Sequence, residues 1–363
     1  MILALLVCLI VGIFLLPYWL ISAHPFPKPS GKWHVGTTEF TWNLPNHSGI
    51  IAKIWYPSNA KDCGSSPYID RLDRTLSAMT AGISPLAKLL LNKFYLGRIQ
   101  TPSEADATLA TRKASFPVIL LSPGFGGINF LNSFYALEFA SHGFMVIGIN
   151  HPKYNSGTLL TDGSHVKFDG IDFTNVSLDR AEKLLAETIT QQANNLAVVL
   201  DELLHLNTDP DSWLYQKIDP RRIFTVGHST GGSASFLACG TDSRILKSVN
   251  LDGFLFMDRI DVASIEQEFL LILSNRDKQA SSVSKSTNIF GALMAQDRTR
   301  IERFTSHDNV HKEIFDSASH WSFLDLALMI NPRFSDRFSW FSRKNGLALL
   351  SQTSATIIDF LKN

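Results

Sequence analysis

A serine flanked by glycines stands where one apolar run ends and an alanine-rich run begins. The stretch from Gly227 to Gly231 reads G-x-S-x-G, with Ser229 at its centre. It follows Ile223 to Val226, which predicts a strand, and precedes Ser233 to Cys239, which predicts a helix. On such a sharp turn the serine backbone is strained and its neighbours must be small. The turn exposes the hydroxyl at a helix N-terminus, so the pattern predicts a nucleophilic serine.

The two residues beside Ser229 have different expected roles. The backbone N–H of Thr230 lies at the positive end of the helix, where it can stabilise a developing oxyanion. The side chain of His228 points away from that of the serine in such a turn, so we expect His228 to be a packing residue.

A serine hydroxyl needs a base, and in this kind of site the chain order is Ser, acid, His. Three histidines follow Ser229, namely His307, His311 and His320. His311 lies in the expected strand Val310 to Phe315 and His307 precedes it, which puts both at the wrong end of the sheet. We expect His320, in the loop after that strand, to be the base.

The position of the acid leaves two candidates. Asp252 ends the apolar run Ile245 to Leu251, and Asp277 follows the run Phe269 to Leu273. Residues at the carboxyl end of either strand can reach the histidine. Each carboxylate could hold the imidazole in one tautomer and stabilise the imidazolium.

A second oxyanion donor should come from the loop after an earlier strand. The run Pro117 to Leu121 leads into Ser122 to Gly127, which is rich in turn-forming residues. Pro123 has no N–H, so the expected donor is Phe125, with Gly124 as the alternative.

The runs that precede these residues predict a parallel sheet. They do not alternate between apolar and polar residues, which is typical of strands covered on both faces. Helical patterns separate them, and the clearest begins after a predicted N-cap at Ser177. This alternation predicts a doubly wound α/β fold. Upstream, His34 to Trp42 and Ile50 to Tyr56 are expected to form antiparallel strands that open the sheet.

Composition narrows the function classes. The 363 residues include 33 Lys and Arg against 33 Asp and Glu, so there is no basic excess of the kind that binds nucleic acid. With 45% hydrophobic residues the chain can bury a large core, and three cysteines are too few for a disulfide scaffold or a thiolate metal site. The sequence indicates no cofactor, no metal and no particular oligomeric state.

The N-terminus divides into two short parts before the main domain. Residues 1–23 are almost entirely apolar and are expected to be either a membrane anchor or a signal peptide, which implies a membrane-anchored or exported protein. Residues 24–32 are proline-rich and read as a linker. Residues 33–363 form one catalytic domain in this interpretation.

Taken in order, these motifs resemble the plasma-type platelet-activating-factor acetylhydrolases, a family of α/β-hydrolase phospholipases. The acid candidate Asp252 lies close after Ser229, as in that family. The resemblance extends from about Gly31 to the C-terminus. It rests on Val35 to Thr38, Trp55 to Ser58, Ser141 to Phe144, Asn150 to Pro152, Gly227 to Ser229, Leu251 to Gly253 and Ser319 to Trp321.

The resemblance implies an α/β-hydrolase fold and a cofactor-free serine esterase. It places the nucleophile at Ser229, the base at His320 and the acid at Asp252 rather than Asp277. It implies oxyanion donors at Phe125 and Thr230, and a substrate with a short or oxidised acyl group at the sn-2 position of a phospholipid, cleaved without calcium.

Two departures from the family bear on acyl-chain preference rather than on catalysis. The family often has His-Gly where this chain has Pro123-Gly124, and an aromatic residue where Thr230 stands. The oxyanion donors are backbone groups, so neither departure removes one.

Two other functions remain open at this point. One is a broad carboxylesterase for soluble or polymeric esters, and the other is a catalytically silent, hydrolase-like binding module. An amphipathic stretch from Ser84 to Phe94 could rest on a membrane surface or bury its apolar side in the domain.

Overall fold

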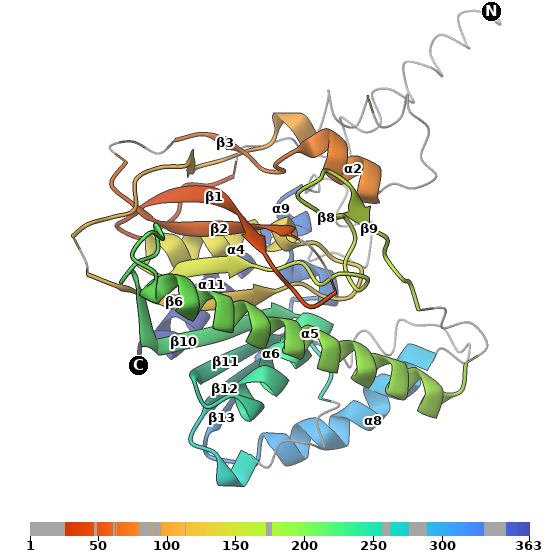
Figure 1. Cartoon of the computed structure of the whole chain (residues 1–363). Coiled ribbons are helices and arrows are strands. Elements are labelled where there is room, and N and C mark those ends of the chain that lie inside the picture. The colour runs from red at the N-terminus through yellow and green to blue at the C-terminus, as the bar shows by residue number, and fades with distance from the viewer. Residues whose placement is uncertain are drawn as a thin grey trace, which may run out of the picture.

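A nine-stranded sheet forms the centre of the protein in a computed structural model of the chain (Figure 1). The structure describes residues 26–46, 49–60, 62, 64–79, 89, 96–112, 114–171, 176–255, 262–275, 289–329 and 346–363. The strand order is β13-β12-β11-β10-β6-β7-β2-β1-β5. Its strands are β1 (His34–Trp42), β2 (Ile50–Ser58), β5 (Glu104–Ala105), β6 (Phe116–Ser122), β7 (Met145–Gly148), β10 (Ile218–His228), β11 (Ile245–Leu251), β12 (Glu268–Ser274) and β13 (Val310–Phe315).

Neighbouring strands of this sheet are parallel, except in the two pairs that contain β2. The predicted antiparallel opening and parallel centre are therefore confirmed. Two small antiparallel pairs lie outside the sheet and are formed by β3 (Ser66–Pro67) with β4 (Gln100–Thr101) and by β8 (Thr158–Leu159) with β9 (His165–Val166).

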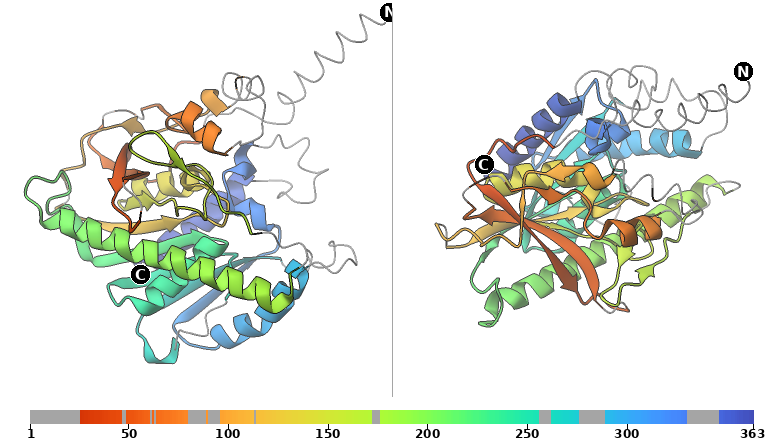
Figure 2. Two further views of the ribbon diagram at one scale, coloured as in Figure 1. Left: turned by 45° about the vertical axis from the view of Figure 1, so that its right-hand side comes forward. Right: turned by 90° about the horizontal axis from the view of Figure 1, so that it is seen from above.

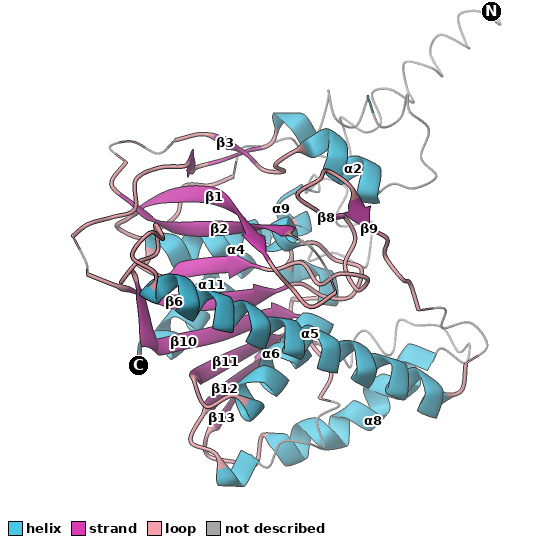
Figure 3. Cartoon of the chain, viewed as in Figure 1, coloured by secondary structure: helices cyan, strands magenta, loops and turns pink. Residues whose placement is uncertain are grey.

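Helices cover both faces of the sheet. Figures 1 and 3 show α5, α6 and α8 in front of it and α4 and α11 behind it, and the view from above in Figure 2 shows the sheet between these two layers. The helices are α2 (Leu72–Met79), α4 (Ser133–Ser141), α5 (Leu178–Thr208), α6 (Thr230–Thr241), α8 (Ile289–Phe304), α9 (Leu326–Met329) and α11 (Gly346–Lys362). Short 3-10 turns are η1 (Leu96–Arg98), η2 (Asn129–Asn132), η3 (Val262–Ser264) and η4 (His320–Phe323).

The central strands, such as β6 and β7, bury side chains on both faces, which explains their apolar runs without alternation. In β6, Val118 and Leu120 belong to the hydrophobic cluster on the side of α5 and α6. Ile119 and Leu121 belong to the cluster that contains α4 and α11 residues. The long helix α5 begins as predicted, because the Ser177 side chain accepts a hydrogen bond from the N–H of Arg180.

The described part of the proline-rich segment contacts the domain. Phe26 is buried against the Tyr68 ring, with ring centroids 4.9 Å apart, and its N–H donates to the Gln100 carbonyl at 3.1 Å. The Ser30 hydroxyl donates to the Glu138 carboxylate at 2.8 Å. Residues 26–32 are thus held on the surface beside α4, and the role of residues 24–32 as a linker stays a prediction.

The two predicted membrane-related segments fall mostly outside the described residues. Residues 1–23 are not described, and of the stretch from Ser84 to Phe94 only Leu89 is, with an exposed side chain. Among the helices that the structure describes, none is both long and apolar enough to span a membrane.

The chain reverses its direction of winding between β6 and β10. From β6 it proceeds through α4 to β7 on one side, and from β10 it proceeds through α6 to β11 on the other side. Such a reversal leaves a crevice at the carboxyl ends of the two strands, the usual ligand position in a doubly wound sheet. The predicted oxyanion loop follows β6 and Ser229 follows β10, so the topology brings both to this crevice.

Candidate active site

Ser229 occupies a strained turn between β10 and α6. Its backbone has φ 57° and ψ −130°, a conformation that an L-residue rarely adopts. The turn leaves no room for a side chain at Gly227, because a Cβ atom there would lie 2.2 Å from the carbonyl oxygen of Gly231. The strain and the close packing are the features expected of a nucleophile elbow.

Asp252 and His320 form a hydrogen-bonded pair. The His320 Nδ1 lies 2.8 Å from Oδ2 of Asp252, whose side chain is almost fully buried, whereas the His320 side chain is about one quarter exposed. A carboxylate can only accept, so Nδ1 carries the proton and Nε2 is left as the basic nitrogen. Asp252 also has a positive φ of 57° and follows β11, the strand next to β10.

Ser274, at the end of β12, holds the Asp252 carboxylate and was not among the residues predicted for the site. Its N–H donates to Oδ1 at 3.0 Å and its hydroxyl to Oδ2 at 2.8 Å. These bonds fix the carboxylate plane that His320 meets. The usable signal was a hydroxyl residue at the carboxyl end of the strand beside β11.

Asp325 ties the segment after His320 to the helix that follows the oxyanion loop. Its carboxylate accepts from the N–H groups of Ser133 and Phe134 at the start of α4, at 2.8 and 3.0 Å, and from the Tyr68 hydroxyl at 3.0 Å. Burial raises the pKa of Asp325 well above its usual range, while these donors act in the opposite direction. The base-bearing loop is therefore anchored at Asp252 and at Asp325.

The oxyanion loop packs directly on the nucleophile. A Cβ atom placed on Gly124 would lie 2.9 Å from the Ser229 Cβ, so the two backbones nearly touch. Gly124 to Gly127 forms a β-turn closed by the Gly127 N–H and the Gly124 carbonyl at 2.9 Å, with φ 68° at Gly126. The hydrogen bond that closes this turn is donated by the N–H of Gly127, so it does not engage the N–H of Phe125.

Asn155 supports the same loop from the segment after β7. Its side-chain Nδ2 donates to the Gly124 carbonyl at 2.8 Å, and its Oδ1 accepts from the N–H of His151 at 2.6 Å. The His151 Nε2 lies 2.8 Å from the Ser122 hydroxyl at the end of β6. Asn155, His151 and Ser122 are fully buried, so this support is rigid.

Three further hydrogen bonds join the two segments. They hold the Gly124–Gly127 turn against the segment that follows β7. The bonds run from Gly126 N to Tyr154 O at 2.8 Å, from Ser156 N to Gly127 O at 3.0 Å and from Ser156 Oγ to Gly126 O at 2.9 Å.

Aromatic rings surround the loop and the base. Phe125 and Phe168 are in contact, with ring centroids 5.0 Å apart, and Trp321 lies edge-on to His320 at 5.5 Å. The Trp321 side chain is 43% exposed. These rings place apolar surface next to the loop and next to His320.

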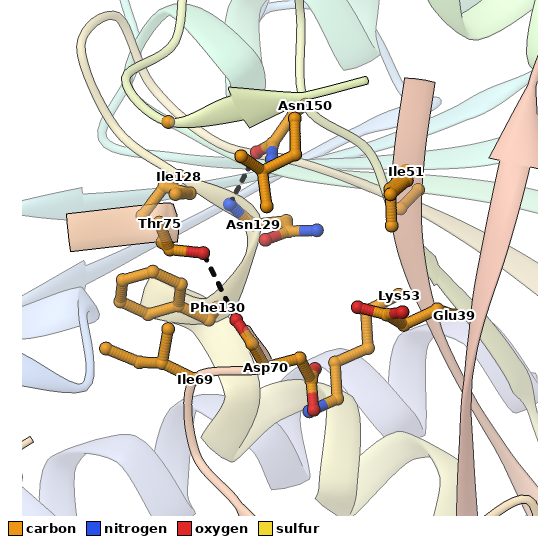
Figure 4. A pocket seen from close by; sticks show the side chains of 13 residues that line it. Glu39, Ile51, Lys53, Ile69, Asp70, Thr75, Ile128, Asn129, Phe130 and Asn150 are labelled. Carbon is orange, nitrogen blue, oxygen red and sulfur yellow. Dashed lines mark hydrogen bonds and ion pairs between the residues drawn. The ribbon is translucent and has the colours of Figure 1, made fainter. Parts of the chain in front are cut away.

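A small cavity of about 40 Å³, lined by both polar and apolar side chains, lies beyond the oxyanion loop (Figure 4), with room for roughly two or three water molecules. Its charged groups hold one another, as the Lys53 Nζ lies 2.6 Å from Asp70 and the Glu39 carboxylate pairs with Arg71 at 2.7 Å. Asn129 forms part of the wall and donates its N–H to Asn150 Oδ1 at 2.8 Å. This hydrogen bond in the cavity wall anchors the segment that follows the oxyanion loop.

The structure brings most of the predicted residues together at the carboxyl edge of the central strands. Asp252 contacts His320, Gly124 abuts Ser229, and Thr230 is the first residue of α6, where a backbone N–H has no partner within the helix. The alternative acid, Asp277, lies outside the described residues.

The expectation for His228 was incomplete. It is buried, as a packing residue would be, but its Nε2 also lies 2.8 Å from the His320 carbonyl oxygen. The catalytic roles of Ser229, Asp252, His320, Phe125 and Thr230 stay predictions.

Comparisons with known proteins bear on the fold and the family. A ferulic acid esterase from Streptomyces cinnamoneus superposes with a TM-score of 0.61 over 87% of this chain and 82% of that chain, at 22% identity. This likeness, together with the mostly parallel sheet between two helical layers, confirms the predicted α/β-hydrolase fold.

Sequence relatives agree with the predicted resemblance. The platelet-activating factor acetylhydrolase of Bos taurus is 26% identical over 316 residues, covering 82% of this chain and 69% of that protein. The probable 1-alkyl-2-acetylglycerophosphocholine esterase of Arthroderma benhamiae is 28% identical over 162 residues, covering 45% and 36%. The family described as platelet-activating factor acetylhydrolase, isoform II, matches residues 20–362. The chain therefore belongs to this acetylhydrolase family.

Proposed function

We propose that the protein is a serine esterase that hydrolyses short or oxidised acyl groups at the sn-2 position of phospholipids. The observation that carries the proposal is the hydrogen bond between His320 and Asp252, beside the strained turn that presents Ser229. A buried carboxylate, an oriented imidazole and a serine at a helix N-terminus together provide acyl transfer.

The proposed reaction has two steps. In the first, the basic nitrogen of His320 takes the proton of the Ser229 hydroxyl, whose oxygen attacks the ester carbonyl. The lysophospholipid alcohol then leaves with that proton. In the second, His320 activates a water that cleaves the acyl-enzyme. Asp252 stabilises the imidazolium in both steps.

The oxyanion formed in each step needs donors that are already in place. We assign them to the backbone N–H groups of Phe125 and Thr230. The β-turn from Gly124 to Gly127 and its support by Asn155 hold the first donor, and the start of α6 holds the second. Fixed donors of this kind contribute about 3 to 4 kcal/mol each to the transition state.

Family membership and the named relatives support the substrate class. The Bos taurus relative is named as an acetylhydrolase of platelet-activating factor, and the Arthroderma benhamiae relative as a probable esterase of 1-alkyl-2-acetylglycerophosphocholine. The exposed Trp321 and the Phe125–Phe168 pair suit a lipid substrate presented at a membrane surface. Residues 1–23 would then serve as a membrane anchor or an export signal.

The test is the release of acetate from an sn-2-acetyl phospholipid in the presence of EDTA. A long-chain phospholipid and p-nitrophenyl acetate are assayed beside it, with wild type, Ser229→Ala and the matched control Ser306→Ala, an exposed serine after α8. The proposal expects turnover that favours the acetyl phospholipid, is lost in Ser229→Ala and is kept in Ser306→Ala.

The other outcomes separate the alternatives. Serine-dependent turnover of p-nitrophenyl acetate alone would leave a broad carboxylesterase and discard the phospholipid assignment. No turnover of any ester by wild type would leave a silent binding module.

A further inference from the structure

His228, the residue before the proposed nucleophile, touches the proposed base. Its Nε2 lies 2.8 Å from the backbone carbonyl oxygen of His320, and the two imidazole rings are 4.5 Å apart between centroids, with 41° between their planes. His228 ends β10, whereas His320 begins η4, and 92 positions separate them in the chain. Only 3% of His228 is exposed.

The chemistry of this contact fixes the direction of the hydrogen bond. A carbonyl oxygen can only accept, so Nε2 of His228 carries the proton. The titratable groups that act on His228 are His320 and Asp252. Burial first, and the neighbouring His320, lower the pKa of His228 to about 3. His228 is therefore a neutral donor with one defined tautomer at neutral pH.

We propose that His228 is a positioning residue that fixes the backbone of His320 relative to Ser229. The proposal rests on the assignment of Ser229 and His320 as nucleophile and base. His228 and Ser229 are consecutive residues of one strained turn, so the peptide that presents the nucleophile also holds the base. Asp252 fixes the rotation of the His320 ring, and His228 fixes the position of its main chain.

If His228 served only to fill space in the core, it would not need to donate a hydrogen bond to the His320 carbonyl. An apolar side chain of similar volume fills the same space, but it leaves the His320 carbonyl without this hydrogen bond, so the main chain at His320 is held less firmly relative to Ser229. A shift of about 1 Å between reacting groups can cost about 100-fold in rate. Substrate binding depends on the rim of the site rather than on this bond, so the loss should fall on kcat and not on KM.

The test compares three substitutions at His228 on p-nitrophenyl acetate, with the thermal unfolding temperature of each variant. His228→Gln places an amide nitrogen at about the reach of Nε2 and can donate to the same carbonyl. His228→Met has similar bulk and no donor. The side chain of His228→Asn has an amide donor but is too short to reach the His320 carbonyl, so it provides a second variant without this hydrogen bond if the methionine variant does not fold.

We expect kcat to fall about 10- to 100-fold in His228→Met and His228→Asn with KM within about twofold, and to recover to within about fivefold of wild type in His228→Gln. Equal kcat in all variants would overturn the proposal, and so would equal loss in all three or a change confined to KM. If wild type shows no Ser229-dependent esterase activity, the proposed function fails first and this inference fails with it.

Discussion

Ser274 donates two hydrogen bonds to Asp252, one to each carboxylate oxygen, from the end of the neighbouring strand. The hydroxyl shares Oδ2 with His320, at 2.8 Å from each partner. Ser274 therefore holds the Asp252 carboxylate in one orientation, and that carboxylate in turn orients the His320 ring.

Removing that hydroxyl should slow the reaction without weakening substrate binding. In Ser274→Ala the backbone bond to Oδ1 remains and the bond to Oδ2 is lost, which frees the carboxylate to turn away from His320. We expect kcat on p-nitrophenyl acetate to fall about 10-fold, the cost of roughly 1.4 kcal/mol, with KM unchanged. Ser306→Ala is the matched control. A Ser274→Ala variant with wild-type kcat would show that Asp252 needs no such support.

The support of the oxyanion loop can be tested at Asn155. Asn155→Ala removes the donor to the Gly124 carbonyl and leaves two buried backbone groups without their partner. We expect kcat to fall about 100-fold as the Phe125 N–H loses its position, and the free energy of unfolding to fall by about 1 to 3 kcal/mol.

Asn59→Ala is the control for Asn155, because Asn59 donates to the Leu109 carbonyl at an exposed site away from the crevice. Steady-state kinetics and urea unfolding of both variants are the measurements. A loss of stability in Asn155→Ala with full kcat would mean that the loop keeps its geometry without the clamp.

The elbow predicts a sharp difference between two glycine substitutions. Gly227→Ala would put a Cβ atom 2.2 Å from a backbone oxygen, which the turn cannot avoid. We expect that variant to lose more than 3 kcal/mol of stability or to fail to fold. Gly291→Ala, in α8, meets nothing within 4 Å and should be neutral or stabilising by up to about 1 kcal/mol. Thermal unfolding of the two variants checks this, and similar unfolding temperatures would contradict the close packing.

Two buried histidines should make stability fall in mild acid. Burial lowers the pKa of His151 and of His228 to about 3, from the ordinary 6.5. Below pH 6.5 the unfolded chain therefore binds protons that the folded chain does not. Each histidine contributes its full stability above pH 6.5 and loses about 1.4 kcal/mol per pH unit as the pH falls toward 3.

Urea unfolding at pH 7.5 and pH 5.0 tests this dependence. Between these values each buried histidine should account for about 2 kcal/mol of lost stability. Between pH 7.5 and pH 5.0 we therefore expect His151→Gln to lose about 2 kcal/mol less of its free energy of unfolding than wild type. Equal losses in the two proteins would show that His151 takes up its proton in the folded state.

The buried strands could be predicted because strands covered on both faces appear in the sequence as short apolar runs without alternation. The predicted ranges of β11 and β13 coincide with the observed Ile245–Leu251 and Val310–Phe315. The observed β6 and β12 are each one residue longer at both ends than the predicted runs, and the start of α5 was predicted from its N-cap. Strand ranges and helix starts of this kind depend on neighbouring residues in the chain, so the sequence alone is enough to predict them.

The contacts that orient the site could not be predicted, because each joins residues far apart in the chain. Ser274 lies 22 positions from Asp252, Asn155 lies 31 positions from Gly124, and His228 lies 92 positions from His320. Chain position also left Asp252 and Asp277 equivalent, since both follow strands that end at the same edge of the sheet. The family resemblance favoured Asp252, and the folded arrangement shows Asp252 in contact with His320, whereas Asp277 lies outside the described residues.

The most direct test of the account is covalent labelling of the nucleophile. Wild type, Ser229→Ala and Ser306→Ala are treated with a fluorophosphonate, and the modified residue is located by peptide mass spectrometry. The account predicts one adduct, on Ser229, in wild type and in Ser306→Ala, and no adduct in Ser229→Ala. An adduct on another serine, or labelling that survives in Ser229→Ala, would contradict the assignment of Ser229 as the nucleophile.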